Sequence, residues 1–313
     1  MNTKEMIDSI LSETGKAVLG KDEVLEKILC AVLAGGHILI DDIPGVGKTT
    51  IALSFTRVLG LDYKRIQFTP DVLPSDITGF SMYDKESGTF RYVEGAAMTN
   101  FLLADEINRA SPKTQSALLE VMQEGKLSVD GKTYPVPKPF IVMATQNPFG
   151  SSGTQELPES QTDRFMIRLT VGYPERDDEI RILSGKERVK PESLSPVLSS
   201  SELSALQQEV TKVHVEDSLY GYMTDLARMT RNHQDIRLGV SPRGTMALSA
   251  MTKAHALMMG RDYAVPDDVI AVALSTLGHR ISLSGDALYG GKTAGSILTS
   301  ILESLPLPSL KEE

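Results

Sequence analysis

The sequence contains one cysteine and five histidines, and these low counts exclude several kinds of site. Cys30 cannot form an intrachain disulfide or a zinc ribbon. The apolar residues around it predict a buried side chain rather than a reactive thiol. The histidines are scattered and form no HExxH pattern, so we expect no metal cage built from side chains.

Basic residues and long apolar runs are also scarce. Lys and Arg total 32 against 41 Asp and Glu, which gives a net charge of −9. So acidic a chain, without a dense Lys/Arg run, is not expected to bind nucleic acid electrostatically. The longest apolar run, residues 28–40, is shorter than the about 20 residues that cross a bilayer. The first ten residues lack the shape of a signal peptide, so we expect a cytoplasmic protein without direct membrane insertion.

Apolar segments of strand length alternate with helical patterns in the first half of the chain. Strands are predicted near residues 37–41, 63–68, 100–105, 139–145 and 165–171. Continuous apolar strands separated by helices favour a parallel sheet covered on both faces, the α/β class. After residue 172 every strong pattern is helical, beginning with an amphipathic pattern at 172–183. We therefore predict an αβα core over residues 1–172 and a small all-α domain over residues 173–313.

Two segments interrupt this alternation. Residues 69–98 are rich in Gly, Pro, Asp and Ser and contain only short β-like pieces. Residues 125–137 predict a hairpin, with Asp130 and Gly131 at its turn. Between them, Ser111 is a good N-cap for a helix that Gly125 ends.

The segment DDIPGVGKTT, residues 41–50, lies between a predicted strand and a predicted helix. Its glycines let backbone N–H groups turn toward an anion at the helix N-terminus. Lys48 supplies a mobile charge for the β- and γ-phosphates, and the Thr49 hydroxyl can hold Mg²⁺. The strict pattern begins with glycine where this chain has Asp42, so a glycine-rich turn is the alternative. The predicted nucleotide-binding residues of the loop are Pro44, Gly45, Val46, Gly47, Lys48, Thr49 and Thr50.

Polar side chains also follow two other predicted strands. FLLADE ends in Asp105, predicted to position Mg²⁺ with Thr49, and in Glu106, predicted to orient and deprotonate the attacking water. In MATQNP, Asn147 is placed to sense the γ-phosphate or to hold that water. The alternative is that Asn147 and the proline after it form an ordinary Asn-Pro turn. No N-K-x-D motif for guanine is present, so ATP with Mg²⁺ is the expected ligand.

Nine segments in one order resemble the AAA+ ATPases, and within them the MoxR family. They include DDIPGVGKTTIA, FLLADEINRASPKTQSALLEVMQEGKL, MATQNP, ELPESQTDRF, SPRGTMAL and GRDYAVPDDV. The resemblance implies a P-loop core with a five-stranded parallel sheet between helices, followed by a small all-α lid domain. It also implies that residues 69–98 are the helix insertion of this clade. An acidic residue at position 42 is compatible with the family, whereas EGAAM at 94–98 departs from it.

The resemblance assigns further roles. By this resemblance Val18, Leu19 and Gly20 line the adenine, and Asn147 is the first sensor. The resemblance also implies that Arg164 is an arginine finger that reaches a neighbouring chain and that Arg243 is the second sensor on the lid. Without the family, Asp163-Arg164 predicts a local ion pair, and Ser241-Pro242-Arg243 predicts a helix cap followed by a surface arginine.

The family resemblance implies a homo-oligomer, expected to be a hexameric ring, that uses ATP as a chaperone-like remodeller or maturation factor. Its expected partners are von Willebrand factor A domain proteins and protein clients. Three alternatives stay open. A non-hydrolysing nucleotide switch is disfavoured by Glu106, and a DNA-remodelling motor by the net charge, although Lys126, Lys132 and Lys138 lie in or beside the hairpin. A chelatase-like subunit depends on partners that the sequence does not show.

Overall fold

The computed structural model describes residues 2–147, 157–185 and 189–308. A five-stranded parallel sheet in the order β2-β5-β8-β1-β9 forms its centre. The strands are β1 (Ile38–Asp41), β2 (Tyr63–Gln67), β5 (Phe101–Asp105), β8 (Ile141–Gln146) and β9 (Ile167–Leu169). This sheet confirms the predicted α/β class, and all five strands lie where the apolar runs predict them.

Helices cover both faces of the sheet because successive strand side chains point to opposite sides. Ile38 and Ile40 of β1 belong to the core beneath α1, α2 and α3, whereas Leu39 packs with α5 on the other face. These helices are α1 (Thr3–Gly15), α2 (Asp22–Leu33), α3 (Lys48–Val58) and α5 (Pro112–Glu124). Ser111 caps α5 by accepting from the Thr114 N–H, and Gly125 ends it with a left-handed backbone, as predicted.

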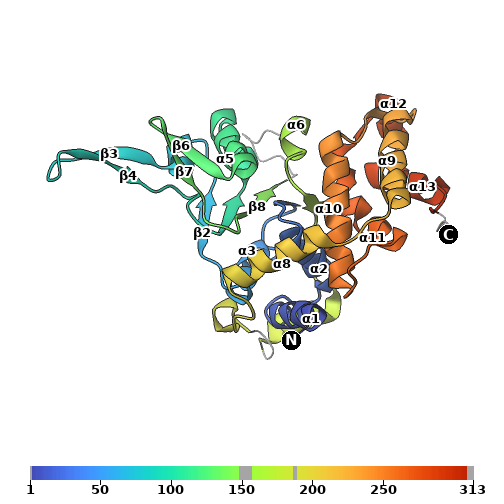
Figure 1. Cartoon of the computed structure of the whole chain (residues 1–313), viewed down its shortest axis with the longest axis horizontal. Coiled ribbons are helices and arrows are strands. Elements are labelled where there is room, and N and C mark those ends of the chain that lie inside the picture. Colours follow the sequence, from blue (N-terminus) through green and yellow to red (C-terminus); the bar gives the residue numbers. More distant parts are fainter. Residues whose placement is uncertain (1, 148–156, 186–188, 309–313) are drawn as a thin grey trace.

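The two interrupting segments form antiparallel ribbons. The insertion contains α4 (Pro74–Thr78), β3 (Phe80–Asp84) and β4 (Thr89–Val93). Its ribbon extends from one side of the molecule, away from the sheet (Figure 1). The second ribbon consists of β6 (Lys126–Val129) and β7 (Lys132–Pro135), joined at Asp130-Gly131. Gly95, in the atypical 94–98 segment, lies so close to the backbone of Ile77 that a Cβ would clash.

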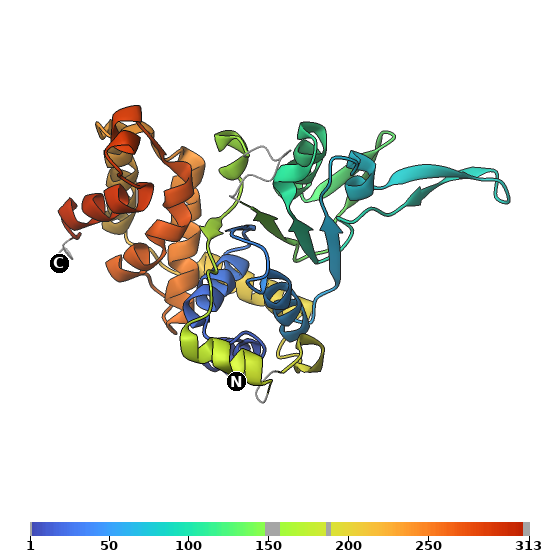
Figure 2. The same ribbon diagram turned by 180° about the vertical axis from the view of Figure 1, so that it is seen from behind.

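The helices after residue 172 gather mainly on the side opposite the β3–β4 ribbon (Figure 2). They and the short elements between them are α7 (Arg176–Ser184), η2 (Pro191–Ser193), α8 (Ser200–Lys212), α9 (Asp217–Asn232), β10 (Ile236–Leu238), α10 (Pro242–Met258), α11 (Pro266–Leu277), η3 (Gly278–Arg280), β11 (Ser282–Leu283), α12 (Gly285–Tyr289) and α13 (Ala294–Ser304). The short β10–β11 pair is an addition to the predicted helices. One buried apolar cluster runs from α2 into α8, α9 and α10, so this region packs firmly on the core.

The helix α7 lies at the surface of the protein. The amphipathic pattern at 172–183 does form a helix, but none of the side chains of α7 is buried. Among the helices of the described residues, none is both long enough and apolar enough to cross a bilayer.

Candidate functional site

The loop after β1 has the backbone of an anion site. Gly45 and Gly47 have φ values of 90° and 92°, which only glycine adopts without strain. A Cβ built at either glycine meets no atom within 4 Å, so the space above the loop is open. Gly47 is the N-cap of α3, and within the described part of the chain this helix has no side-chain cap hydrogen bond. The helix N-terminus therefore presents its donors and its dipole to an incoming phosphate.

Lys48 is the first residue of α3, and its ammonium group folds back over the loop. Its Nζ donates to the Asp42 carbonyl oxygen at 2.6 Å. Burial lowers the pKa of Lys48 below its usual value. The carboxylates that oppose this shift are Asp42, Asp105, Glu106 and Asp41. The predicted phosphate-binding lysine and the predicted acids therefore lie together in the fold.

Asp42, the residue that departs from the strict loop pattern, is buried at 5% exposure. Its Oδ1 accepts from the Ile43 N–H at 2.7 Å. Its Oδ2 accepts from the N–H groups of Val171 and Gly172 at 2.7 and 2.6 Å. The carboxylate is thus occupied by backbone donors, two of them from the chain that leaves β9.

Asp105 ends β5 and is held by two neighbours. The Thr145 hydroxyl donates to its Oδ1 at 2.6 Å, and the Arg65 guanidinium donates to its Oδ2 at 2.6 Å. Thr145 is fully buried in β8, between β5 and β1 in the sheet. The hydroxyl of Thr145 also accepts from the Glu106 N–H at 2.9 Å. One buried threonine therefore orients both predicted acids.

Glu106 has a left-handed backbone, with φ 56° and ψ 47°. A non-glycine residue in this region is strained, and such strain is concentrated at functional sites. The Glu106 carboxylate accepts from Arg109 at 2.8 Å. Asn108, on the same turn, donates through Nδ2 to the Asn147 carbonyl oxygen at 3.3 Å. Asn147 thus lies beside the turn that carries Glu106, although Pro148 lies outside the described residues.

The donors beside the loop fit a magnesium ion of the kind that accompanies a nucleotide. Mg²⁺ usually keeps several waters and takes one or two protein ligands plus phosphate oxygens. Each Asp105 oxygen accepts one hydrogen bond, which leaves lone pairs for a metal-bound water. The Thr49 hydroxyl lies in the first turn of α3, next to Lys48. Among the described residues, no group of three or more His, Cys, Asp or Glu side chains could hold a metal alone.

The segment predicted to line the adenine lies between α1 and α2. Val18 is buried in the core, whereas Leu19 and Gly20 line a cavity of about 560 Å³. Asp178 of α7 also lines this cavity, and a Cβ on Gly20 would clash with its carboxylate. Glycine at position 20 is therefore required both by its φ of 67° and by this close approach.

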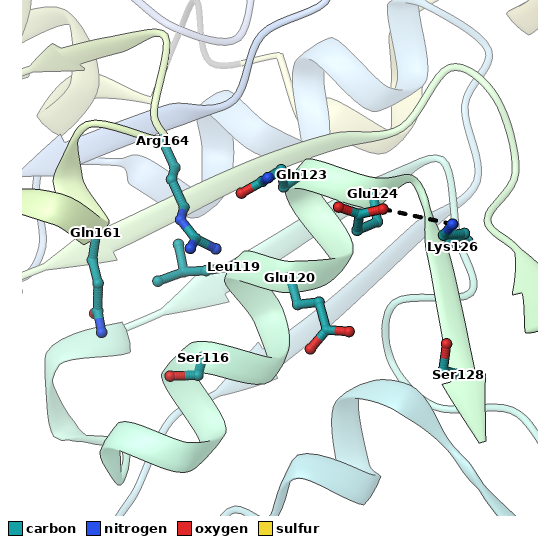
Figure 3. A pocket seen from close by; sticks show the side chains of 9 residues that line it. All are labelled: Ser116, Leu119, Glu120, Gln123, Glu124, Lys126, Ser128, Gln161 and Arg164. Atoms are coloured by element: carbon teal, nitrogen blue, oxygen red, sulfur yellow. Dashed lines mark ion pairs between the residues drawn. The ribbon is translucent and has the colours of Figure 1, made fainter. Parts of the chain in front are cut away.

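Arg164 and Arg243 lie together, but on the other edge of the sheet from the phosphate loop. They share a cavity of about 170 Å³ with Met122 and Gln123 of α5. Figure 3 shows Arg164 extended beside Leu119 and Gln123. The Met122 carbonyl oxygen is bound by His37, which precedes β1, so this cavity lies at the amino edge of the strands. The phosphate loop follows the carboxyl end of the same strand.

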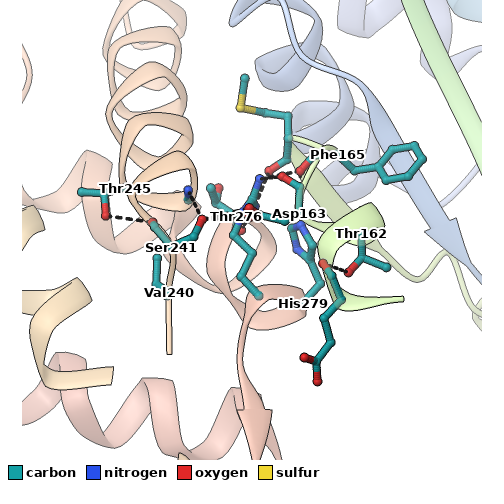
Figure 4. Close-up of polar contacts among 12 residues, drawn as sticks. Thr162, Asp163, Phe165, Val240, Ser241, Thr245, Thr276 and His279 are labelled. Carbon is teal, nitrogen blue, oxygen red and sulfur yellow. Dashed lines mark hydrogen bonds and ion pairs between the residues drawn. The ribbon is translucent and has the colours of Figure 1, made fainter. Parts of the chain in front are cut away.

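The contacts of Asp163 decide between the sequence interpretations of this segment. Asp163 accepts from the Ser241 hydroxyl at 2.9 Å (Figure 4). Its ion pair, at 2.8 Å, is with Arg280 and not with Arg164. Ser241 does cap α10, as the helix-cap interpretation predicts. The Arg164 Nε is buried and has no hydrogen-bond partner among the residues that the structure describes. A buried donor of this kind needs an explanation, such as an acceptor from outside the chain.

Sequence reasoning missed the residues that hold the acids. Each of three carboxylates at the loop has an arginine partner: Arg65 on Asp105, Arg109 on Glu106 and Arg168 on Asp41. Thr145 was missed as well. The only signal was position, because Arg65 and Thr145 both lie in strands that neighbour β5, with Thr145 near the carboxyl end of β8.

Comparisons with known proteins identify the family of this chain. The model of the ATPase family associated with various cellular activities (AAA) matches residues 37–167, and the model of the AAA lid domain matches residues 228–301. The uncharacterised protein YeaC of Bacillus subtilis is 44% identical, over 97% of this chain and 95% of YeaC. Chaperone MoxR1 of Mycobacterium tuberculosis is 38% identical, over 97% of this chain and 83% of that protein.

A solved structure matches over almost the whole chain. The crystal structure of a candidate ATPase from Cytophaga hutchinsonii has a TM-score of 0.91 and 34% identity, covering 98% of this chain and 96% of that one. The fold, the phosphate loop and these relatives together indicate an enzyme that binds and hydrolyses ATP. The chain belongs to the MoxR family of AAA+ ATPases.

Proposed function

We propose that ATP hydrolysis takes place between neighbouring chains of a ring, which we expect to be hexameric, and that it depends on Mg²⁺. Lys48 and the loop N–H groups bind the phosphates, and Thr49 with Asp105 holds the ion, which neutralises phosphate charge. Glu106 takes the proton of the attacking water, and Asn147 orients that water.

The single observation that carries this proposal is the separation of the two arginines from the loop of their own chain. Arg164 and Arg243 meet at the amino edge of the sheet, whereas the loop follows its carboxyl edge. The four residues of β1 alone span about 13 Å between these edges. A nucleotide on the loop is therefore out of reach of both arginines of the same chain, and we propose that both serve a second copy. Charge that grows on the transferred phosphoryl group is stabilised there by Arg164.

Mixing two inactive variants tests this arrangement. Glu106→Gln removes the base but keeps both arginines, and Arg164→Ala keeps a complete loop but supplies no finger. Each alone should bind ATP without hydrolysing it, and the mixture should regain activity because some sites combine a good loop with a good finger. Arg228→Ala, at an exposed arginine on α9, is the matched control and should hydrolyse ATP normally. An inactive mixture in which the two variants co-assemble would rule out sharing between chains.

We further propose that the ring acts on other proteins, as the name of the relative Chaperone MoxR1 suggests for that protein. Proteins with a von Willebrand factor A domain are the expected partners, and the cytoplasm, which supplies ATP, is the expected location. Glu106→Gln should hold the ATP-bound assembly on its client. Affinity capture with this variant, compared with Lys48→Ala as a nucleotide-free control, should enrich such a partner in an ATP-dependent way. Equal recovery with both variants would contradict the proposal.

A further inference from the structure

A buried arginine links the segment around Arg164 to the helices after residue 172. Arg280, at the end of η3, has a side chain only 2% exposed. Its guanidinium donates to acceptors on both sides of Arg164. These acceptors are the Asp163 carboxylate at 2.8 Å, the Asp163 carbonyl at 3.2 Å, the Phe165 carbonyl at 2.5 Å and the Met166 carbonyl at 3.1 Å. The Thr276 carbonyl holds the same group from α11.

The Asp163 carboxylate has a second partner, on α10. The Ser241 hydroxyl donates to it at 2.9 Å and also accepts from the Gly244 N–H at 3.1 Å as the cap of the helix. Asp163 directly precedes Arg164, and Ser241 lies two residues before Arg243. One carboxylate therefore links the segment that carries Arg164 to the start of the helix that carries Arg243, through the contact between Asp163 and Ser241 (Figure 4).

The packing leaves this junction little freedom. A Cβ on Gly244 would lie 2.6 Å from the Cδ of Arg280, so α10 rests directly against the arginine stem. A buried guanidinium must be paired and hydrogen-bonded to be tolerated. Burial lowers the pKa of Arg280, the Asp163 carboxylate opposes this shift, and the positive charge of Arg243 adds to it. The junction is thus a closely packed, hydrogen-bonded unit beside the half-buried Arg164 and the exposed Arg243.

We propose that Asp163, Ser241 and Arg280 are positioning residues that hold Arg164 and Arg243 as one unit, and so set the hydrolysis rate on the neighbouring chain without touching nucleotide. This inference rests on the proposed function, because it requires the two arginines to act on a second copy. Its physical basis is that a catalytic group misplaced by about 1 Å can lose about 100-fold in rate.

Ser241→Gly is the sharpest test. Glycine costs a helix cap only a few tenths of a kcal/mol relative to serine, so α10 should persist while the bond to Asp163 is lost. We expect kcat to fall about tenfold with KM for ATP unchanged. Ser199→Gly removes the equivalent cap of α8, away from both arginines, and should leave kcat unchanged. Arg280→Lys keeps the charge but loses most of the contacts, and should lower kcat further.

Mixed assemblies separate positioning from a general weakening of the fold. Glu106→Gln chains supply intact arginines, so adding them should restore hydrolysis on the loops of Ser241→Gly chains. A wild-type kcat for Ser241→Gly, or a defect that Glu106→Gln chains do not restore, overturns the inference. Failure of the Arg164→Ala mixture as well would instead overturn the proposed function on which it rests.

Discussion

Asp42 shows how a residue that departs from a motif can belong to the site. Where the strict pattern has glycine, this carboxylate accepts three backbone N–H groups, two of them beyond β9. A carboxylate with three donors is strongly satisfied and has no need of a cation or a solvent contact. Asp42 therefore fixes the start of the phosphate loop to the segment that follows β9. Its carboxylate is satisfied by hydrogen bonds from backbone N–H groups.

Replacing Asp42 by alanine tests this role. Asp42→Ala leaves the Val171 and Gly172 N–H groups without their acceptor, so the free energy of unfolding should fall by about 1–3 kcal/mol. Denaturant unfolding measures this change, with Asp71→Ala, at an exposed aspartate, as the control. Equal stability of the two variants would show that the three hydrogen bonds contribute nothing net.

Contacts beyond the sequence motifs determine how Asp105 and Glu106 are presented. Their spacing after an apolar strand predicts two acids at a strand end. The buried Thr145 hydroxyl and the strained backbone of Glu106 come from the packing of β5 against β8. No local pattern in FLLADE specifies a left-handed glutamate, since that conformation is disfavoured for every residue except glycine and a few polar ones.

At the scale of secondary-structure elements, His37 directly precedes β1 and contacts both β8 and α5. Its Nδ1 accepts from the Val142 N–H at 3.0 Å, in β8, and its Nε2 lies 3.0 Å from the Met122 carbonyl of α5. The ring also packs edge-on against Phe140. Because Nδ1 accepts, the imidazole must be neutral, and burial lowers the pKa of His37 to about 4.

This histidine predicts a pH dependence of stability. The unfolded chain takes up the proton near the usual value of about 6.5, whereas the folded chain does so only near 4. The stability is therefore fully present above pH 6.5 and is lost as the pH falls toward 4. By pH 5 His37 should cost about 2 kcal/mol of unfolding free energy, and burial shifts the pKa of His279 in the same direction. His37→Gln, which stays neutral, should have a shallower slope between pH 7 and pH 5, and an unchanged slope would contradict this account.

Periodicity predicted the type of most elements but not the surface each one covers. The α7 segment forms its helix, yet Leu183 is 79% exposed and no side chain of α7 is buried. The hairpin at 125–137 was predicted, whereas residues 69–98 were expected to contain only short β-like pieces, and the projection of β3 and β4 away from the body was not predicted (Figure 1). A hydrophobic pattern reports which side chains share a face, and only the neighbours in space decide whether that face is covered.

At the scale of the whole molecule, the loop and the arginines occupy opposite edges of one sheet. The site shared between two chains that we propose predicts that activity depends on protein concentration. On dilution below the assembly range, the rate per chain should fall toward that of Arg164→Ala, a loss of about 10³-fold or more. ATPase rates measured across a dilution series, with light scattering to follow assembly, test this. A rate per chain that stays constant while the particles dissociate would show that one chain suffices.

The sequence by itself determined the αβα order and the position of the glycine-rich loop, and it predicted Asp105 and Glu106 as the acids, because these depend on local periodicity and on residues adjacent along the chain. It also separated the helical region from the sheet. Only the tertiary structure decided which backbone groups donate to Asp42 and that Thr145 orients Asp105 and Glu106. It also decided that Arg280 joins the segments of Arg164 and Arg243. These contacts link residues 39 to 129 positions apart, and such pairs are set by how strands and helices pack, which no local pattern encodes.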